Sequence, residues 1–342
     1  MNYYLSRNYR NTTSAGNKAK TDIEAIMDSM GYRYAGLSQS HLKGSAAAFF
    51  RTLGSVIKAP WSLHKGDMLV VQYPLKKYFS AVCHAAHLRG AKVVAVIHDL
   101  GSFRRKALTP EREIRRLDNA DYIIAHNRAM KEWLEAHGIK RPVDTLEIFD
   151  YLSSSEAPLR TSEPGSTPRI VYAGGLNRRK NAFIYEMGEH LGPCKVALYG
   201  RGFEADEARC KEKFDYKGFT PSDTLIATAD GHFGLVWDGD STDGCTGDFG
   251  EYLRYNNPHK VSLYLRCNLP VILWREAAMA PFITHEGAGF TVGSIDEIPQ
   301  RIAALEPGEY LRMKKKAEDM SKKLASGHFI RAALARAEQA LK

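Results

Sequence analysis

Short, continuous apolar runs recur along the sequence, each separated from the next by a segment with helical periodicity. The run VVAVI at 93–97 lacks the polar–apolar alternation of a strand that faces water on one side. Strands of that composition are buried on both faces, as in a parallel sheet that helices cover on each side. Similar runs occur at 68–74, 121–127 and 169–175. The pattern predicts an α/β protein built from βαβ units.

The alternation is interrupted at residues 153–168, where SSSEAPLRTSEPGSTP is rich in Ser, Pro and Gly and has no apolar period. Such a composition is typical of a linker between domains. At 342 residues the chain is also long for a single hydrophobic core. We therefore expect two doubly wound, Rossmann-like domains, at 1–152 and 169–325. Their ligand cleft would lie between the carboxyl ends of the two sets of strands.

The balance of charge predicts an anionic partner. The chain has 48 Lys and Arg against 39 Asp and Glu, a formal net charge of +9. A phosphorylated small molecule, a membrane surface and nucleic acid all fit such a charge. Zinc-finger, homeodomain and RNA-binding signatures are missing from the sequence, so we expect no nucleic acid partner.

The cysteines and the N-terminus bear on the compartment. The five cysteines are scattered without a CxxC pair, which argues against a zinc site or a disulfide framework and favours a reducing compartment. The sequence begins without a secretory signal and contains no apolar stretch long enough to span a bilayer. We therefore expect a cytoplasmic protein.

Two expected strands end in glycine next to arginine, in YAGGLNRRK at 172–180 and in YGRG at 199–202. Glycine lets the backbone approach a ligand closely, and a helix that starts at the arginines would favour an anion there. Ordinary strand-to-helix turns have the same composition, and this alternative stays open. Neither segment forms a dinucleotide fingerprint or a P-loop. The candidate ligand-binding residues are Gly174, Gly175, Arg178, Arg179, Gly200 and Arg201.

A polar segment, RYNNPHK at 254–260, stands directly before an apolar helix and the strand LPVILW. Pro258 suits the first turn of that helix, and an asparagine before it can cap the helix. Lys260 then falls in the first turn, where a cation opposes the helix dipole and a bound diphosphate would compensate. A capped helix with a solvated lysine is the alternative. The candidate ligand-binding residues of this segment are Tyr255, Asn256, Asn257 and Lys260.

These segments together resemble bacterial galactofuranosyltransferases and, more distantly, UDP-sugar-dependent glucosyltransferases that extend sugars on bacterial adhesins. The resemblance covers most of the chain and is most specific between residues 234 and 292, in WDG after HFGLV and in GEYLRYNNPHKVSLYLRCNLPVILW followed by EAAMAPFI. GYRYAGL near the N-terminus and VVAVIHDL also fit. The resemblance implies a GT-B fold, which is two Rossmann-like domains facing a central cleft. It also implies a last helix, 326–342, that crosses back to the first domain.

The resemblance further implies roles for individual residues. Arg178 or Arg179 would meet the diphosphate of the donor, and Lys260 would be a further phosphate ligand. Phe219 would lie at the nucleobase pocket, where related glucosyltransferases have tyrosine. On the first domain, a polar loop would close over the phosphates with Thr13, Ser14 and Gly16.

Catalysis by inversion requires a base for the acceptor hydroxyl. VVAVIHDL places His98 and Asp99 at the end of a strand, where the cleft is expected. We expect Asp99 to be the base, with His98 orienting it or contacting the sugar. An aspartate that only caps the following turn is the alternative, and a retaining transfer would need no such base.

The acidic segment WDGDSTDGCTGDFGE at 237–251 contains an Asp-x-Asp that invites a metal. The GT-B fold implied by the resemblance uses basic residues and helix ends in place of a metal. We therefore expect no metal or other cofactor, and a mobile loop at 238–251 that contacts sugar or acceptor.

The expected activity is transfer of a sugar, galactofuranose in the first instance, from a UDP-sugar to a hydroxyl of a surface polysaccharide or a lipid-linked glycan precursor. A glucosyl- or other hexosyltransferase acting on a glycoprotein glycan is one alternative, and a non-catalytic nucleotide- or carbohydrate-binding subunit is another. The basic stretch 102–117 is either a solvated helix face or a contact with an anionic membrane at its inner face. Apolar positions in the last two helices leave a homo-oligomer open.

Overall fold

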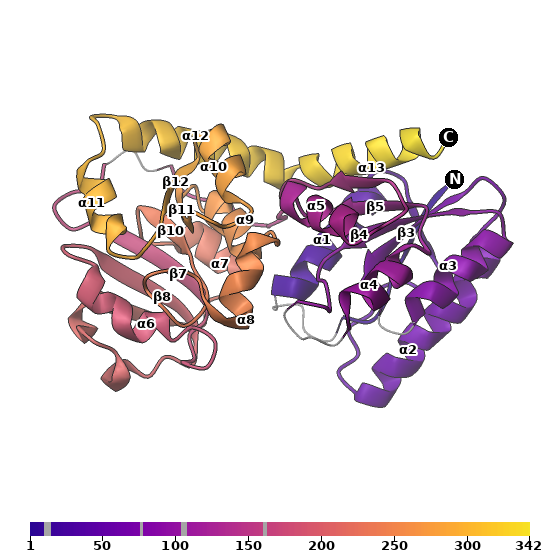
Figure 1. Ribbon diagram of the computed structural model, residues 1–342, viewed down its shortest axis with the longest axis horizontal. Helices are drawn as coiled ribbons and strands as arrows, with labels where there is room; N and C mark the ends of the chain where they lie inside the picture. The colour runs from indigo at the N-terminus through magenta and orange to yellow at the C-terminus, as the bar shows by residue number, and fades with distance from the viewer. Residues whose placement is uncertain (10–14, 76–77, 104–107, 160–162) are drawn as a thin grey trace. The chain divides into compact units, whose positions relative to one another are not determined.

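The computed structural model describes residues 1–9, 15–75, 78–103, 108–159 and 163–342. The chain forms two compact units, the first from Met1–Asp150 with Gly327–Lys342 and the second from Tyr151–Ser326. Each unit contains one six-stranded sheet, and the paired strands of both sheets run parallel (Figure 1). The expectation of an α/β protein with two parallel-sheet domains is confirmed.

The first unit combines a parallel sheet with helices from both ends of the chain. Its strands are β1 (Asn2–Leu5), β2 (Arg33–Ala35), β3 (Met68–Tyr73), β4 (Lys92–Ile97), β5 (Tyr122–Ala125) and β6 (Val143–Thr145). Its helices are α1 (Ala15–Ser29), α2 (Ser45–Lys58), α3 (Phe79–Leu88), α4 (Pro110–Leu117), α5 (Arg128–Ala136) and α13 (His328–Ala340), with the 3-10 helix η1 (Ala59–Ser62) after α2. The strand order is β2-β1-β3-β4-β5-β6, so the winding reverses between β1 and β3.

The central strands of this sheet are buried on both faces, as their composition predicts. In β4, Val93, Val94, Ala95, Val96 and Ile97 are all fully buried. Burial of such side chains stabilises the fold by roughly 1.5–3 kcal/mol for each large one. Helix α13 belongs to this unit although it is distant in sequence, and its Ile330, Ala333, Leu334 and Ala337 are buried.

The second unit has the strands β7 (Arg169–Gly175), β8 (Lys195–Arg201), β9 (Phe214–Gly218), β10 (Phe233–Val236), β11 (Val271–Trp274) and β12 (Gly289–Val292). Its helices are α6 (Phe183–Glu186), α7 (Ser222–Thr228), α8 (Gly247–Gly250), α9 (His259–Arg266), α10 (Ala280–Glu286), α11 (Glu297–Ala303) and α12 (Glu309–Ala325). Short 3-10 helices are η3 (Met187–His190), η4 (Ala205–Glu207), η5 (Lys211–Lys213) and η6 (Glu251–Arg254). The strand order is β12-β11-β10-β7-β8-β9, so the winding reverses between β7 and β10.

The segment expected to be a linker makes specific contacts with the second unit. Ser153 and Ser154 donate hydrogen bonds from their hydroxyls to the carboxylate of Asp223, at 2.7 and 3.0 Å. Glu156 pairs with the buried Arg266 of α9 at 3.2 Å. These side chains hold the described part of the segment against the rest of the second unit.

Within residues 1–9, 15–75, 78–103, 108–159 and 163–342, no helix is both long and apolar enough to cross a membrane.

Candidate functional site

In the second unit, polar groups gather where β7 and β10 end. These two strands are neighbours in the sheet, with Phe233 paired to Ile170, and the winding of the chain reverses between them. In open α/β sheets, ligands bind outside the carboxyl ends of the strands at such a reversal, because the two following connections diverge and leave a crevice. The ends of β7 and β10 are therefore the first place to look for a site.

Helix α9 is fastened to this edge by Tyr264. Its hydroxyl accepts a hydrogen bond from the backbone N–H of Ala173 at 2.8 Å. Its ring packs on Gly234 of β10, where an added Cβ would lie 2.2 Å from the ring. Lys260 stands one helical turn before Tyr264 and so lies on the same face of α9. The sequence thus directs the lysine side chain to the ends of the two strands.

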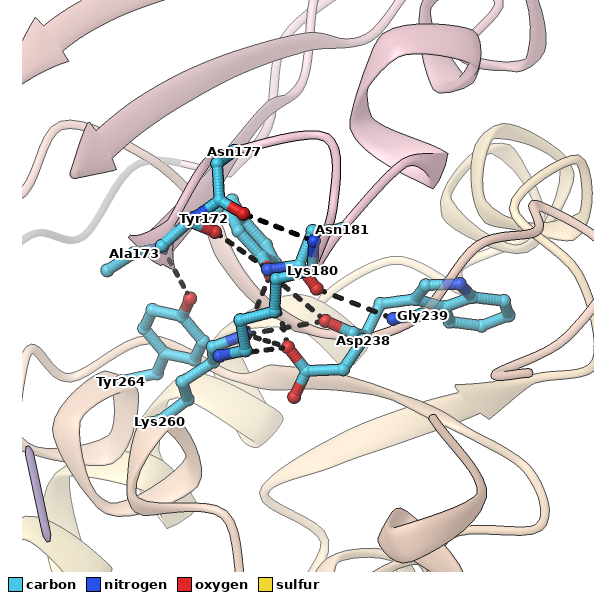
Figure 2. Close-up of polar contacts among 11 residues, drawn as sticks. Tyr172, Ala173, Asn177, Lys180, Asn181, Asp238, Gly239, Lys260 and Tyr264 are labelled. Carbon is cyan, nitrogen blue, oxygen red and sulfur yellow. Dashed lines mark hydrogen bonds and ion pairs between the residues drawn. The ribbon is translucent and has the colours of Figure 1, made fainter. Parts of the chain in front are cut away.

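Lys260 is the centre of the polar cluster shown in Figure 2, and its side chain is only 13 % exposed. Its Nζ donates to the hydroxyl of Tyr172 at 2.8 Å, to Asp238 Oδ1 at 2.9 Å and to the carbonyl of Trp237 at 3.3 Å. The ammonium also lies 4.2 Å from the centre of the Tyr172 ring. Burial lowers the pKa of Lys260, and the carboxylate of Asp238 acts in the opposite direction.

The alternative interpretation, a helix capped by asparagine with a solvated lysine, is wrong. Pro258, and not an asparagine, occupies the N-cap position of α9, with extended backbone. The charge of Lys260 is compensated by Asp238 rather than by solvent. Asn257 is buried, and Asn256 has a buried Oδ1 without a hydrogen-bond partner among the residues that the structure describes. Tyr255 is half-buried in the turn before the helix.

Asp238 is shared by two ammonium groups. Lys180 Nζ lies 3.8 Å from Asp238 Oδ1, the same oxygen that Lys260 contacts. Asn181 connects the same region, since its amide donates to the carbonyl of Gly175 at 2.7 Å and accepts from the backbone of Gly239 at 3.4 Å. One carboxylate between two lysines leaves surplus positive charge in a half-buried site, which favours an anionic ligand.

Two of the predicted glycines are required by this packing. A Cβ on Gly174 would lie 3.1 Å from Cε of Lys260, so a larger residue would crowd the lysine. A Cβ on Gly200 would lie 1.8 Å from the carbonyl oxygen of Gly174, its neighbour in the β7–β8 ladder. Each glycine thus admits another part of the chain, and the expectation that it lets the backbone approach a ligand stays a prediction.

The structure places the two predicted arginines differently from the expectation. Helix α6 begins at Phe183 and has four residues, so Arg178 and Arg179 precede it in an exposed turn and do not open a helix. Arg178 pairs with Glu207 at 3.2 Å. Arg179 lines a cavity of about 200 Å³ together with Gly239, Asp240, Thr246, Gly247, Asp248 and Phe249. The acidic loop and Arg179 therefore meet at one small cavity.

Arg201 and Phe219, which were predicted separately, lie together. The guanidinium carbon of Arg201 is 4.4 Å from the centre of the Phe219 ring, a cation–π contact. Phe219 remains 43 % exposed. An exposed aromatic ring with an arginine beside it is suited to stack on a nucleobase.

The first unit carries a second polar cluster, where β1, β3 and β4 end. His98 and Asp99 follow β4, and His98 Nε2 lies 2.7 Å from Oε1 of Gln72 on β3. The amide nitrogen of Gln72 donates to the carbonyl of Lys20 at 3.2 Å. Because that acceptor fixes the orientation of the amide, Gln72 Oε1 accepts the hydrogen bond and His98 carries a proton on Nε2. The His98 ring also stacks on Phe149, 5.3 Å between centres.

Glu24 stands behind Gln72 in this cluster. Gln72 Nε2 lies 3.3 Å from Glu24 Oε1, and the same carboxyl accepts hydrogen bonds from the hydroxyls of Ser6, at 2.7 Å, and Tyr9. Burial raises the pKa of Glu24 to about 7, while the hydrogen bonds from Ser6 and Tyr9 act to lower it. Glu24 and Gln72 were not among the predicted site residues, although a glutamine inside the apolar strand LVVQY was a signal for a buried polar group.

Asp99 is half-buried beside this cluster. Its Oδ1 is buried and has no hydrogen-bond partner among the described residues. A carboxylate oxygen that is desolvated without a donor is costly to the fold and is a common feature of functional sites. The residues that the structure describes therefore leave one oxygen of Asp99 available for a ligand hydroxyl.

Three predicted residues near the N-terminus are placed only in part. Thr13 and Ser14 lie outside the described residues. Gly16 belongs to the first turn of α1 and not to a loop, and its carbonyl accepts a hydrogen bond from Lys20 Nζ at 3.1 Å.

This chain is similar in sequence to glycosyltransferases, both to family models and to individual proteins. Two family models match, the Glucosyltransferase 3-like N-terminal domain over residues 2–148 and the Glucosyltransferase 3-like C-terminal domain over residues 170–337. The β-1,6-galactofuranosyltransferase WbbI of Escherichia coli (strain K12) is 31% identical over 333 residues, which are 96% of each chain. Glucosyltransferase 3 of Streptococcus parasanguinis is 22% identical, over 96% of this chain and 95% of that protein.

A solved structure of an α-glucosyltransferase in complex with UDP shares the fold. It superimposes with a TM-score of 0.54 at 13% sequence identity, over 99% of this chain and 98% of the other. The expected GT-B fold class is thus confirmed.

Proposed function

The chain belongs to the glucosyltransferase 3-like family and is a glycosyltransferase, and from this premise we propose that its donor is a UDP-sugar held by the second unit. The observation that carries the proposal is the pair of lysines, Lys180 and Lys260, which share the single carboxylate of Asp238. A diphosphate supplies the negative charge that this arrangement lacks. Charge-assisted hydrogen bonds from ammonium groups to phosphate oxygens are among the stronger ones in proteins.

The exposed ring of Phe219, with Arg201 against it, is the proposed platform for the uracil. Arg179, at the cavity that the acidic loop also lines, is close enough in sequence to Lys180 to contribute to the phosphate site. A metal is not needed to neutralise the diphosphate when two lysines and an arginine are present. We therefore propose donor binding without a divalent ion.

We propose galactofuranose as the sugar that is transferred, on the similarity to the Escherichia coli enzyme, whose name specifies a β-1,6 linkage. The acceptor proposed is a hydroxyl of a surface polysaccharide or of a lipid-linked glycan precursor. Forming a β bond from an α-linked donor inverts the anomeric carbon, and a single displacement then requires a base. Asp99 is the proposed base, because its buried Oδ1 has no hydrogen-bond partner within the described part of the chain. His98, whose Nε2–H is bound to Gln72, is proposed to orient Asp99 or to contact the sugar.

Glucosyl transfer is the second candidate, because Glucosyltransferase 3 of Streptococcus parasanguinis matches over nearly the whole chain. Turnover with UDP-galactofuranose, UDP-galactopyranose and UDP-glucose, each with a panel of glycan acceptors, separates the two. Transfer from UDP-glucose alone would replace the galactofuranose assignment and leave the donor site unchanged.

The test of the donor site is calorimetric titration with UDP in the presence of EDTA. Wild type is compared with Lys260→Ala and Arg179→Ala, and with Lys211→Ala as a control, since Lys211 is an exposed lysine of the same unit. We expect clear weakening in the first two variants and wild-type affinity in the third. Binding that appears only when a divalent ion is added would overturn the proposed phosphate site.

A further inference from the structure

Helix α2 and the 3-10 helix that continues it expose a row of large apolar side chains. Phe50, Ile57 and Trp61 are 66%, 57% and 78% exposed. Their spacing of seven and then four residues places them on one face of the helix. Phe49 adds to this row with 45% exposure. We call these four side chains the α2 surface.

The opposite side of the helix is tightly bound to the first unit. Ala48, Ser55 and Ala59 are buried there, and the Ser55 hydroxyl donates to the carbonyl of Ser6 at 2.8 Å. Gly36 packs so closely that an added Cβ would lie 2.3 Å from the carbonyl oxygen of Ser55. One face of the helix is therefore packed against the first unit, and the apolar face that carries the α2 surface points outward.

The stretch of sequence that supplies the α2 surface carries charge of one sign. Between Asp28 and Asp67 the sequence contains no Asp or Glu. The same stretch has five Lys and Arg, and it also supplies the whole of the α2 surface. Four of the cations are Arg33, Lys43, Lys58 and Lys65, which are exposed, and Arg51 is half-buried. Acidic side chains that could pair with a basic partner surface are missing from this stretch.

We propose that the α2 surface docks the protein on an anionic lipid membrane. Phe, Ile and Trp side chains insert at the boundary between headgroups and acyl chains, where burying their apolar area is favourable. Trp is well suited to this position because its ring is largely apolar and its N–H stays at the wet boundary. Lysines and arginines beside them are attracted to the negative surface of the leaflet. The surface differs from the basic stretch 102–117, which has no comparable exposed aromatic residues in its described part.

A second copy of the chain is a less suitable occupant. A two-fold dimer would bring the same patch of each subunit together, and the cations of the stretch between Asp28 and Asp67 would then face one another. Like charges across an interface oppose association, whereas anionic headgroups neutralise them. A dimer is therefore kept as an outcome that the experiment must be able to detect.

Trp61 supplies a reporter in the unmodified protein. Trp237 and Trp274 are buried and Trp133 is half-buried, whereas Trp61 is exposed. Vesicles of phosphatidylcholine, with and without phosphatidylglycerol, are added while tryptophan emission is recorded. We expect a blue shift with the anionic vesicles and quenching when their acyl chains carry bromine. Trp61→Phe should remove most of both signals.

Co-sedimentation with the same vesicles measures the affinity without using activity. The double variant Phe50→Ser with Ile57→Ser should lower the partition coefficient by about tenfold or more, because two large apolar side chains are lost. The control is Leu159→Ser, since Leu159 is 77% exposed in the second unit. Thermal melting and UDP titration establish that each variant is folded.

Lys58→Glu should weaken binding to the anionic vesicles and leave the weak binding to phosphatidylcholine unchanged. Three results would overturn the proposal. They are no sedimentation with anionic vesicles, equal losses for the α2 and Leu159 variants, and a light-scattering mass of a dimer that the α2 variants convert to a monomer. Because the readout is lipid binding, the proposal stands or fails separately from the choice of sugar donor.

Discussion

Lys260 and Asp238 form an ion pair at the reversal of the second sheet, with 2.9 Å between Nζ and Oδ1. Both residues belong to the connection between β10 and β11, Asp238 just after β10 and Lys260 in the first turn of α9. Lys180 approaches the same carboxylate from a second connection, the one between β7 and β8. The site is therefore held together by ion pairs in the absence of a ligand. A phosphate that binds Lys260 must either displace Asp238 or share the lysine with it.

The role of the pair in stability can be separated from its role in binding. Lys260→Met leaves the buried carboxylate of Asp238 without its ion-pair partner at 2.9 Å, and we expect a loss of stability of up to about 3 kcal/mol. Adding Asp238→Asn removes that charge and should restore most of the stability. The double variant should still bind UDP about tenfold to a hundredfold more weakly, since a charge-assisted hydrogen bond contributes about 1.5–3 kcal/mol.

Thermal melting and calorimetry on the two single variants and the double variant complete the cycle. Recovery of UDP affinity along with stability in the double variant would show that Lys260 is a structural residue and not a phosphate ligand.

Gly174 is expected to be intolerant of even a methyl group. Gly174→Ala would place Cβ 3.1 Å from Cε of Lys260, so the lysine must move by a few tenths of an ångström. We expect UDP affinity to fall about tenfold, with a smaller change in melting temperature. Gly165→Ala is the matched control, because an added Cβ there meets no atom within 4 Å. Wild-type affinity in Gly174→Ala would mean that the position of Lys260 is not critical.

Phe219 is expected to act on the nucleobase and not on the phosphates. Phe219→Ala removes the exposed ring beside Arg201 and should lower UDP affinity by about 1–3 kcal/mol, the range for base–aromatic stacking. Titration with inorganic pyrophosphate provides the comparison, and its affinity should not change. Equal losses of affinity for UDP and for pyrophosphate would show that Phe219 does not act through the nucleobase.

The sequence allowed the edges of both sheets to be located. A glycine after a buried strand and a basic residue before an apolar helix are local features, and both lie where the α/β pattern predicted. The positions of Gly174, Gly200 and Lys260 at one sheet edge follow from that pattern alone. The start of helix α6 was not predictable in the same way. This four-residue helix begins at Phe183, after an exposed turn that contains both arginines.

The partners of the site residues could not be predicted, because pairing across the fold depends on which connections meet. Asp238 was part of an acidic loop that was interpreted through its own spacing, and nothing local ties it to a lysine 22 positions later. The Gln72–His98 hydrogen bond, 26 residues apart, has the same character. Ser153, inside the expected linker, likewise finds Asp223 only once β7 to β10 are assembled.

Glu24 predicts a pH dependence of stability. Burial raises its pKa in the folded protein from an ordinary value of 4.5 to about 7, so between these values the folded state binds more protons than the unfolded state. Stability from this group is therefore full below about pH 4.5 and is lost as the pH rises towards 7, by on the order of 3 kcal/mol. Arg7 opposes the shift and Asp28 adds to it.

Glu24→Gln mimics the protonated form of the side chain and therefore removes the pH dependence that Glu24 gives to stability. The measurement is the difference in unfolding free energy between wild type and Glu24→Gln from pH 4.5 to 7.5. Contributions from Asp150, whose pKa burial also raises to about 7, and from the buried His126 are the same in both proteins and cancel. A difference that stays constant over this range, or that favours wild type at higher pH, would contradict the role of Glu24.

Asp99 is the residue on which the proposed chemistry depends. Asp99→Asn keeps the shape of the side chain and removes its capacity to accept a proton, so kcat should fall by about a hundredfold to ten-thousandfold. UDP affinity should not change, because the proposed donor ligands belong to the second unit. Gln72→Leu tests the neighbouring His98 by a different readout, since loss of the acceptor at Nε2 frees the tautomer and should shift the pH profile of kcat. Steady-state kinetics with a saturating donor distinguishes these effects. An Asp99→Asn variant with wild-type kcat would exclude the base and favour a retaining transfer, in which no carboxylate at this position is required.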